Sequence, residues 1–187
     1  MQPRRLLLAA SLVLFAGCKS DSTGPGLSGT MSFTFSGGIS GTFSASGTLP
    51  ATIPEQVASP WAAGELNPTD GGVYVEGLLP KTATTHDLAL LFIHRTTVGT
   101  DNISASCSSN CSMLGFLFGQ PRNFAGPPIQ ACDIITGTIT ITEISSTRVK
   151  GTFSGTGTCI DAPVVGNTTS FVVSGGTFDV AFVSAVP

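Results

Sequence analysis

Along most of this chain, apolar side chains alternate with small hydroxyl side chains. Residues 31–36, for example, read Met-Ser-Phe-Thr-Phe-Ser. Successive side chains of a β-strand point to opposite faces, so this period of two indicates strands with one buried face. The chain has 21 Ser, 24 Thr, 23 Gly and 12 Phe but only 10% charged residues, against roughly 25% in an average soluble domain. This composition excludes helical bundles, coiled coils and disordered chains, and it predicts an all-β fold.

Eight to ten strands are expected, and no helix. The predicted strands cover 31–36, 42–49, an edge strand near Trp61, 73–79, 88–93, 113–118, 134–144, 149–157 and 171–182. Residues 88–93 are apolar at every position, which is typical of a strand covered on both faces.

Finer details of the C-terminal strands also follow from the alternation. We expect Ile135, Ile139 and Ile141 to lie on one face, and a turn at Ser145-Ser146. A break in the alternation between Val173 and Phe178 predicts a β-bulge at the intervening glycines.

We therefore predict one all-β domain over residues 30–187, of a size that can bury its own core. An antiparallel β-sandwich is the leading architecture, and a closed, calycin-like barrel is the alternative. The fragment Gly-Thr-Phe-Ser recurs at 41–44 and 151–154. We interpret this recurrence as inward Phe flanked by outward hydroxyls rather than as a duplication.

The first seventeen residues have the layout of a secretory signal. Arg4 and Arg5 precede a ten-residue apolar stretch, which is followed by Ala16 and Gly17. A membrane-spanning helix needs about 20 apolar residues, so this stretch is too short to be one.

The five residues Leu14-Phe15-Ala16-Gly17-Cys18 resemble the lipobox of bacterial lipoproteins. The resemblance implies that Cys18 is acylated and becomes the first residue of the mature protein. Because two or more acyl chains hold a protein stably, the membrane would be a permanent partner. Residues 18–29 then form the lipidated cysteine and a flexible linker. Lys19, where an Asp would favour inner-membrane retention in the enterobacterial pattern, points to the outer membrane.

The segments Arg148-Val-Lys-Gly-Thr-Phe-Ser-Gly and Gly176-Thr-Phe-Asp-Val are similar to those of a group of all-β bacterial lipoproteins of uncharacterised function. The resemblance covers about the last fifty residues, and its motif is structural. It carries no catalytic residue over to this chain.

Four cysteines remain after Cys18, and an even number in an exported protein predicts two disulfides. Three connectivities are possible, and we favour Cys107 with Cys111 and Cys132 with Cys159. The register that places Ile139 and Ile141 on the side of Val149 and Phe153 leaves Cys159 one position away from Cys132. We therefore expect Cys132 just outside its strand or beside a bulge. A zinc site at these cysteines is disfavoured, because neither histidine is near them in sequence.

No catalytic constellation is evident. His86 and Asp87 are adjacent in a predicted strand and should face opposite sides, and His86 and His94 should lie about 26 Å apart, too far to share a metal ion. His94 and Arg95 are expected at the solvent-facing end of that strand. The carboxylates Glu76, Asp87 and Glu143 are scattered, and 67–72 is interpreted as a turn rather than a calcium loop.

We therefore predict no enzymatic activity, no metal and no cofactor. Removing Arg4 and Arg5 changes the net charge from −3 to −5, since 6 basic residues then face 11 acidic ones. Such a chain has no basic surface for nucleic acid. The leading hypothesis is a lipid-anchored binding or structural module of the cell envelope, with an envelope protein, a glycan or a small apolar ligand as its unidentified partner. The alternatives are a carrier with an apolar ligand inside a barrel, and an envelope hydrolase.

Overall fold

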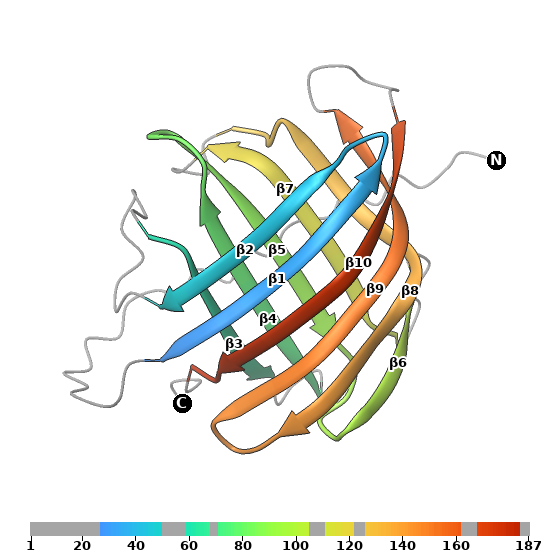
Figure 1. The fold of residues 1–187 in the computed structure, drawn as a ribbon. Coiled ribbons are helices and arrows are strands. Elements are labelled where there is room, and N and C mark those ends of the chain that lie inside the picture. Colours follow the sequence, from blue (N-terminus) through green and yellow to red (C-terminus); the bar gives the residue numbers. More distant parts are fainter. Residues whose placement is uncertain are drawn as a thin grey trace.

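The computed structural model describes residues 27–49, 59–67, 71–104, 111–121, 126–161 and 168–183. This part of the chain contains ten β-strands and no helix, which confirms the all-β prediction (Figure 1). The strands are β1 (Ser28–Gly37), β2 (Gly41–Thr48), β3 (Trp61–Asn67), β4 (Gly72–Pro80), β5 (Thr85–Ile93), β6 (Gly99–Ser104), β7 (Met113–Pro121), β8 (Gln130–Ile144), β9 (Arg148–Asp161) and β10 (Thr168–Ala181).

All ten strands belong to one antiparallel sheet. Its order is β2-β1-β10-β9-β8-β7-β5-β4-β3, and β6 pairs with β8 beside this path. Most neighbours in the sheet are consecutive in the chain. The exceptions are the pairs β5–β7, β6–β8 and β1–β10, and the last joins the two strands furthest apart in sequence. The N-terminal and C-terminal strands therefore lie side by side (Figure 1).

The sheet curls until its two ends nearly meet, as Figure 1 shows. Gly64 of β3 bridges Phe182, just after β10, and the Val183 amide donates a hydrogen bond of 2.8 Å to the Gly64 carbonyl. A β-carbon on Gly29 of β1 would lie only 2.2 Å from the Ala62 carbonyl oxygen of β3. We call this junction of β3 with β1 and β10 the seam. The two halves of the sheet face each other as in a sandwich, and the seam brings its edges together as in a barrel.

Three register shifts, one of them between Ile141 and Glu143 of β8, occur along the long C-terminal strands. The pairing of β10 with β9 shifts between Val173 and Gly176, as predicted, and Gly175 adopts a φ of 61° that favours glycine. A second shift, between Ile134 and Thr136 of β8, leaves Ile135 as an extra residue. The prediction that Ile135 shares a face with Ile139 and Ile141 is therefore wrong. The bulge turns Ile135 outward, where it is 43% exposed, and places Ile134 in the core instead.

Phenylalanine rings pair with glycines of the neighbouring strand to fill the core. Phe171 and Phe178 of β10 lie opposite Gly157 and Gly151 of β9, and Phe153 of β9 lies opposite Gly176. In β1 and β2, Phe35 likewise lies opposite Gly41. A glycine leaves room for the ring of the opposite residue. This packing explains why Gly and Phe recur two positions apart on the inward face of several strands.

The outward face of the same strands is covered by hydroxyl groups. One unbroken row of cross-strand neighbours crosses β2, β1, β10, β9, β8 and β6, and it consists of Ser44, Ser32, Thr177, Thr152, Thr140 and Thr100. Some neighbours bond to each other, as Ser32 Oγ and Thr177 Oγ1 do at 3.0 Å.

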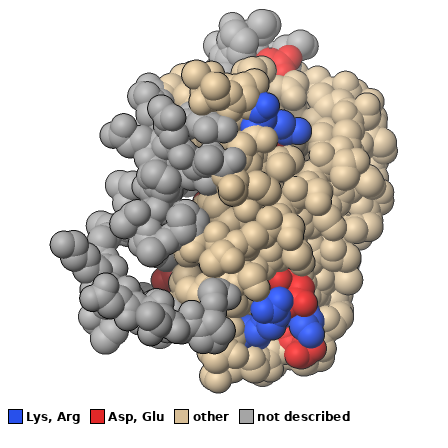
Figure 2. Space-filling view, turned by 60° about the vertical axis from the view of Figure 1, so that its left-hand side comes forward, with Lys and Arg blue, Asp and Glu red and all other residues tan. Residues whose placement is uncertain are grey.

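Several charged side chains of β8, β9 and β10 form pairs of opposite sign. Arg148 binds Asp179, and Lys150 Nζ lies 2.8 Å from Glu143 Oε2. In the view of Figure 2, charged atoms gather in small clusters and leave most of the described surface uncharged.

Candidate functional site

The predicted lipid-attachment residue, Cys18, lies outside the described residues, as do the signal peptide and most of the linker. The first strand begins at Ser28, close to the predicted end of the linker. Within the described ranges, no helix is both long and apolar enough to cross a membrane.

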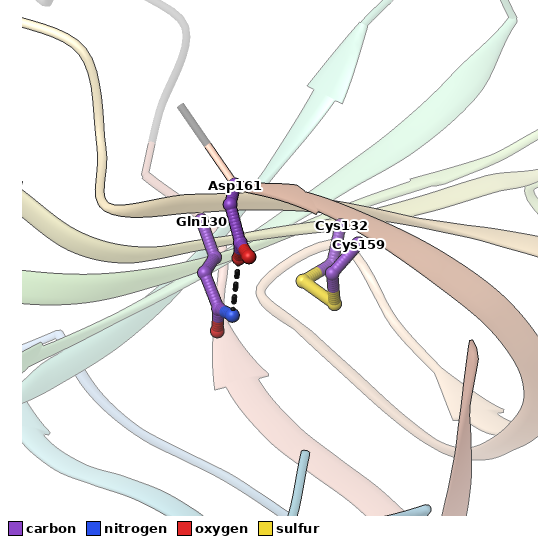
Figure 3. Close-up of a disulfide and its surroundings, with 4 residues drawn as sticks. All are labelled: Gln130, Cys132, Cys159 and Asp161. Atoms are coloured by element: carbon purple, nitrogen blue, oxygen red, sulfur yellow. Dashed lines mark hydrogen bonds between the residues drawn. A yellow bond between two sulfur atoms is a disulfide. The ribbon is translucent and has the colours of Figure 1, made fainter. Parts of the chain in front are cut away.

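The predicted Cys132–Cys159 disulfide is present, and Figure 3 shows it between β8 and β9. The two cysteines are direct cross-strand neighbours because the bulge at Ile135 shifts the register by one residue. This confirms that Cys132 lies beside a bulge. Two positions away, Gln130 Nε2 donates a hydrogen bond of 2.6 Å to Asp161 Oδ1 (Figure 3). Cys111 is also disulfide-bonded, and its predicted partner Cys107 lies outside the described residues.

The histidines do not share a site. His86 is buried within β5 and His94 follows the end of that strand, so eight residues of extended chain separate them. Asp87 is buried too, but it binds Lys81 at 3.1 Å and accepts a hydrogen bond from the Gly119 amide. Arg95 follows the end of β5, keeps 28% of its side chain exposed and binds Asp101 at 2.7 Å.

The three predicted carboxylates also do not share a site. Glu76 lies on the outer face of β4, Asp87 on the inner side of β5, and Glu143 near the end of β8, where it pairs with Lys150. Asn67 is the last residue of β3, and residues 68–70 of the suggested turn lie outside the described ranges. No group of three His, Cys, Asp or Glu residues that could hold a metal ion occurs in the described part of the chain.

The inside of the sheet is filled by aromatic rings. Phe33 of β1 stacks on Phe43 of β2, with ring centroids 4.9 Å apart. It also contacts Phe116 of β7 at 4.6 Å, although β1 and β7 are separated by three strands in the sheet. Rings from opposite walls therefore meet in the middle, where a carrier would need a cavity of several hundred Å³.

A small cavity lies instead on the outer face of β3 and β4. It has a volume of about 20 Å³, and the side chains that line it include Trp61, Glu65, Tyr74 and Glu76. The pleat places Trp61 and Glu65 on the outer face because Ala62, between them, belongs to the inner core. Cross-strand pairing then brings Glu65 opposite Tyr74, one step along the same face from Glu76.

The polar groups of this cavity are partly withdrawn from water. Trp61 is only 1% exposed, and its Nε1 is buried with no hydrogen-bond acceptor among the described residues. Burial raises the pKa of the Glu76 carboxyl from 4.5 to about 7, and burial also raises the pKa of Glu65. The wall of the cavity itself is almost entirely apolar, and it is the desolvated carboxyls of its lining residues that make this face a candidate site.

Aromatic side chains extend this face beyond the cavity. The ring of Tyr74 lies 4.9 Å from that of Phe92 on β5, and Phe92 lies 6.2 Å from His94. These three side chains are half-buried, so each keeps part of its surface accessible. Together, the cavity and this aromatic platform of Tyr74, Phe92 and His94 form the candidate site.

A second hollow, an open groove of about 370 Å³, runs over the outer face of β8–β10. It is lined by hydroxyls of Thr156, Thr158 and Ser170 and by the exposed side chains of Ile135 and Val172. No charged or buried polar side chain converges on it, so it is the weaker candidate.

Sequence reasoning identified only one member of the candidate site. Glu76 was named only as one of several scattered carboxylates and Trp61 only as the mark of an edge strand, whereas Glu65 and Tyr74 carried no signal of their own. They become neighbours of Glu76 only through the register of β3 with β4.

Comparison with known proteins returned no match to a family model, to a curated protein or to a solved structure.

Proposed function

We propose that this protein is a lipid-anchored, non-catalytic binding or structural module of the cell envelope, which meets its partner on the outer face of the sheet. The contact between Phe33 and Phe116 across the interior is the observation that supports this choice. Because rings fill the middle of the fold, the outer face is the better place for a ligand.

The proposal of a lipid anchor is supported by the sequence. The basic residues, the short apolar stretch and Cys18 follow one another as in a lipoprotein signal. Acylation of Cys18 would leave the folded domain outside the bilayer, on a linker whose eleven residues reach roughly 36 Å when extended. A tethered domain with few charges suits a binding or structural role at the outer membrane.

The placement of the ligand can be tested with a fluorescent long-chain fatty acid as the probe. The wild-type protein should show no saturable binding. Phe33→Leu and Phe33→Ala, which remove part or all of a central ring, should create a cavity and gain binding if they stay folded by circular dichroism. Saturable one-to-one binding by the wild-type protein would overturn the proposal in favour of the barrel carrier.

The anchor can be tested by cell fractionation and mass spectrometry. Cys18→Ala should lose the acyl mass and move the protein from the membrane to the soluble fraction, whereas the adjacent Ser20→Ala should change neither. A membrane fraction that stays the same in Cys18→Ala would contradict lipid anchoring.

A further inference from the structure

In the described part of the chain, β2 is the strand whose free side makes no backbone contact. It stands at one end of the sheet order and pairs with β1 alone (Figure 1). The free sides of β3 and β6 are each held by a neighbouring segment. The Gly64 carbonyl of β3 accepts a hydrogen bond from the Val183 amide, and Asn102 and Ser104 of β6 exchange backbone hydrogen bonds with Ser112. The unpaired N–H and C=O groups of β2 can therefore accept a further strand.

The sequence of β2 does not protect this edge. Edge strands usually resist pairing with another chain through a lysine, a proline, an inward charge or a bulge. Residues 41–48 read Gly-Thr-Phe-Ser-Ala-Ser-Gly-Thr, and their pairing with β1 runs without a register shift. The side chains of Thr42, Ser44 and Ser46 are exposed. The edge of β2 is thus regular, uncharged and open to a partner.

β3 approaches β2 from the interior and leaves this edge open. A β-carbon on Gly47 would lie 2.2 Å from the carbonyl oxygen of Pro60, just before β3. Gly47 alternates in phase with Phe43 and Ala45, which are both 1% exposed, so a side chain at this position would point inward. The contact therefore lies on the inner face of β2 and not in the plane of its hydrogen bonds.

The sequence of β2 is complementary to itself when two copies run antiparallel. Around a two-fold axis at Ala45, the opposite positions are Phe43 with Gly47, Ser44 with Ser46 and Thr42 with Thr48 of the second copy. Within its own sheet, the chain already places Phe35 opposite Gly41 and sets hydroxyls opposite hydroxyls along the outward row. Two paired copies would thus repeat both kinds of neighbour that build the fold, a ring beside a glycine inside and two hydroxyls outside.

The charge distribution also favours a second copy. Residues 28–48, which include β1 and β2, contain no charged side chain. Two negatively charged chains can therefore meet at β2 without placing like charges side by side. A foreign strand could use the same backbone groups, but β2 itself supplies matching side chains on both faces.

We propose that two copies of this protein pair through β2, antiparallel and around a two-fold axis at Ala45, so that their ten-stranded sheets become one. Chains anchored in the same membrane have a raised local concentration, so an interface of a single strand pair suffices there. The pairing goes beyond the proposed binding role and does not depend on it, because the same edge is present in a chain without its anchor.

Sedimentation equilibrium of the acylated protein in detergent measures the association. The wild type should dimerise reversibly as its concentration rises to about 1 mM, where weak complexes are occupied. The double variant Ser44→Lys, Ser46→Lys places like charges directly opposite each other across the interface and should weaken dimerisation by about tenfold or more. Thr30→Lys, Ser32→Lys is the matched control, because these positions of β1 lie beside Ser46 and Ser44 but one strand away from the edge. It should dimerise as the wild type does.

A charge swap separates loss of the interface from loss of the fold. The double variant Ser44→Glu, Ser46→Glu should also stay monomeric by itself, but an equimolar mixture of the Lys and Glu chains should form a heterodimer, because opposite charges then face each other.

Cysteine crosslinking tests the register in cell membranes. Only direct neighbours of an antiparallel pair are close enough for a disulfide, since the next position on the same face lies about 7–8 Å away. Differently tagged Ser44→Cys and Ser46→Cys chains, expressed together, should form a disulfide-linked heterodimer on non-reducing gels. Thr30→Cys with Ser32→Cys should not.

Three results would overturn the proposal. One is a wild-type protein that stays monomeric up to about 1 mM and whose Ser44→Cys and Ser46→Cys chains do not crosslink in membranes. Another is equal weakening by the Lys pairs on β1 and on β2. A third is a mixture of Lys and Glu chains, both folded by circular dichroism, that does not associate. A disulfide in the Ser44→Cys chain alone would contradict the axis at Ala45.

Discussion

Glu76 is an ionisable residue among apolar side chains on the outer face of β4. Its cross-strand neighbours on the outer face, Ala63 and Leu90, are apolar, and this carboxyl lies beside the buried Trp61, so it loses part of its hydration. Desolvation disfavours the charged form of a carboxyl, and the pKa therefore rises to about 7. Ionising Glu76 should therefore lower the free energy of unfolding.

The pH dependence of unfolding tests this cost. Between pH 4.5, the ordinary pKa, and about 7, the folded state keeps a proton that the unfolded state has released. The free energy of unfolding should therefore fall as the pH rises through this window. Glu76→Gln removes this slope and should stabilise the protein at pH 8 relative to the wild type by ~1–2 kcal/mol, reduced because the side chain is not fully buried.

Urea denaturation at pH 4.5 and pH 8 measures the difference. Glu143→Gln is the control, because that carboxyl is exposed and paired with Lys150 and should give no such gain at pH 8. Equal effects of Glu76→Gln at both pH values would contradict the assignment.

The Cys132–Cys159 disulfide is a covalent link between β8 and β9. It joins two buried residues that are 27 positions apart. The double variant Cys132→Ala, Cys159→Ala should lower the free energy of unfolding by about 3 kcal/mol, mainly because the unfolded chain gains freedom. Urea denaturation of the double variant and of the wild type under non-reducing conditions measures this loss, because Cys111 is then still bonded in both. A loss below about 1 kcal/mol would show that the paired strands already supply the constraint.

At the scale of the strand, the bulge at Ile135 decides which residues of β8 face the core. The pairs Ile134–Gly157 and Thr136–Thr156 are direct neighbours on either side of it, and nothing on β9 opposes Ile135. A one-residue change of register moves side chains to the other face of a strand. Cys132 and Ile139 are seven positions apart and would face opposite sides of a regular strand. Because of the bulge, both face the core.

Deleting residues tests this role. Deletion of Ile135 should join the two flanking pairs into a regular ladder, so that the Cys132–Cys159 bond still forms and the protein stays folded. Deletion of Thr156, on the facing strand, should turn Cys159 to the wrong face and prevent the bond. Peptide mapping under non-reducing conditions distinguishes the outcomes. Loss of the bond in the Ile135 deletion, or its retention in the Thr156 deletion, would contradict this view of the register.

At the scale of the whole molecule, closure depends on how closely β3 approaches β1. Gly29 lies at the point of contact, where a β-carbon would come within 2.2 Å of the Ala62 carbonyl oxygen. Only a glycine allows the backbones to approach so closely. Because β3 and β1 are far apart in the chain, the seam joins the sheet into one body.

Gly29→Val should therefore force the seam open and destabilise the protein by about 2 kcal/mol, within the usual cost of overpacking. Hydrogen exchange of the Val183 amide, which bonds to the Gly64 carbonyl, reports on the seam and should accelerate. Gly175→Ala is the comparison, since its β-carbon would meet nothing within 4 Å and only the positive φ is strained. It should leave the Val183 amide protected. Unchanged exchange in Gly29→Val would contradict a tight seam.

The sequence by itself indicated nine of the ten strands and most of their inward faces, because both follow from a pleat that repeats every two residues. It missed β6 (Gly99–Ser104) and favoured the Cys132–Cys159 pair among three possible connectivities. It also indicated the bulge at the glycines of β10 and, as one of two alternatives for Cys132, a bulge in β8. The bulge in β8 still reversed the side predicted for Ile135, because alternation alone does not say which residue is the extra one.

Only the tertiary structure decided the pairing of β1 with β10, the closure at Gly29, the meeting of Phe33 with Phe116 and the grouping of Trp61, Glu65 and Tyr74 around Glu76. These features depend on how a curled sheet brings separate strands together and on the register between them. An alternating pattern along one strand is the same whichever strand lies opposite, so local sequence carries no record of these contacts.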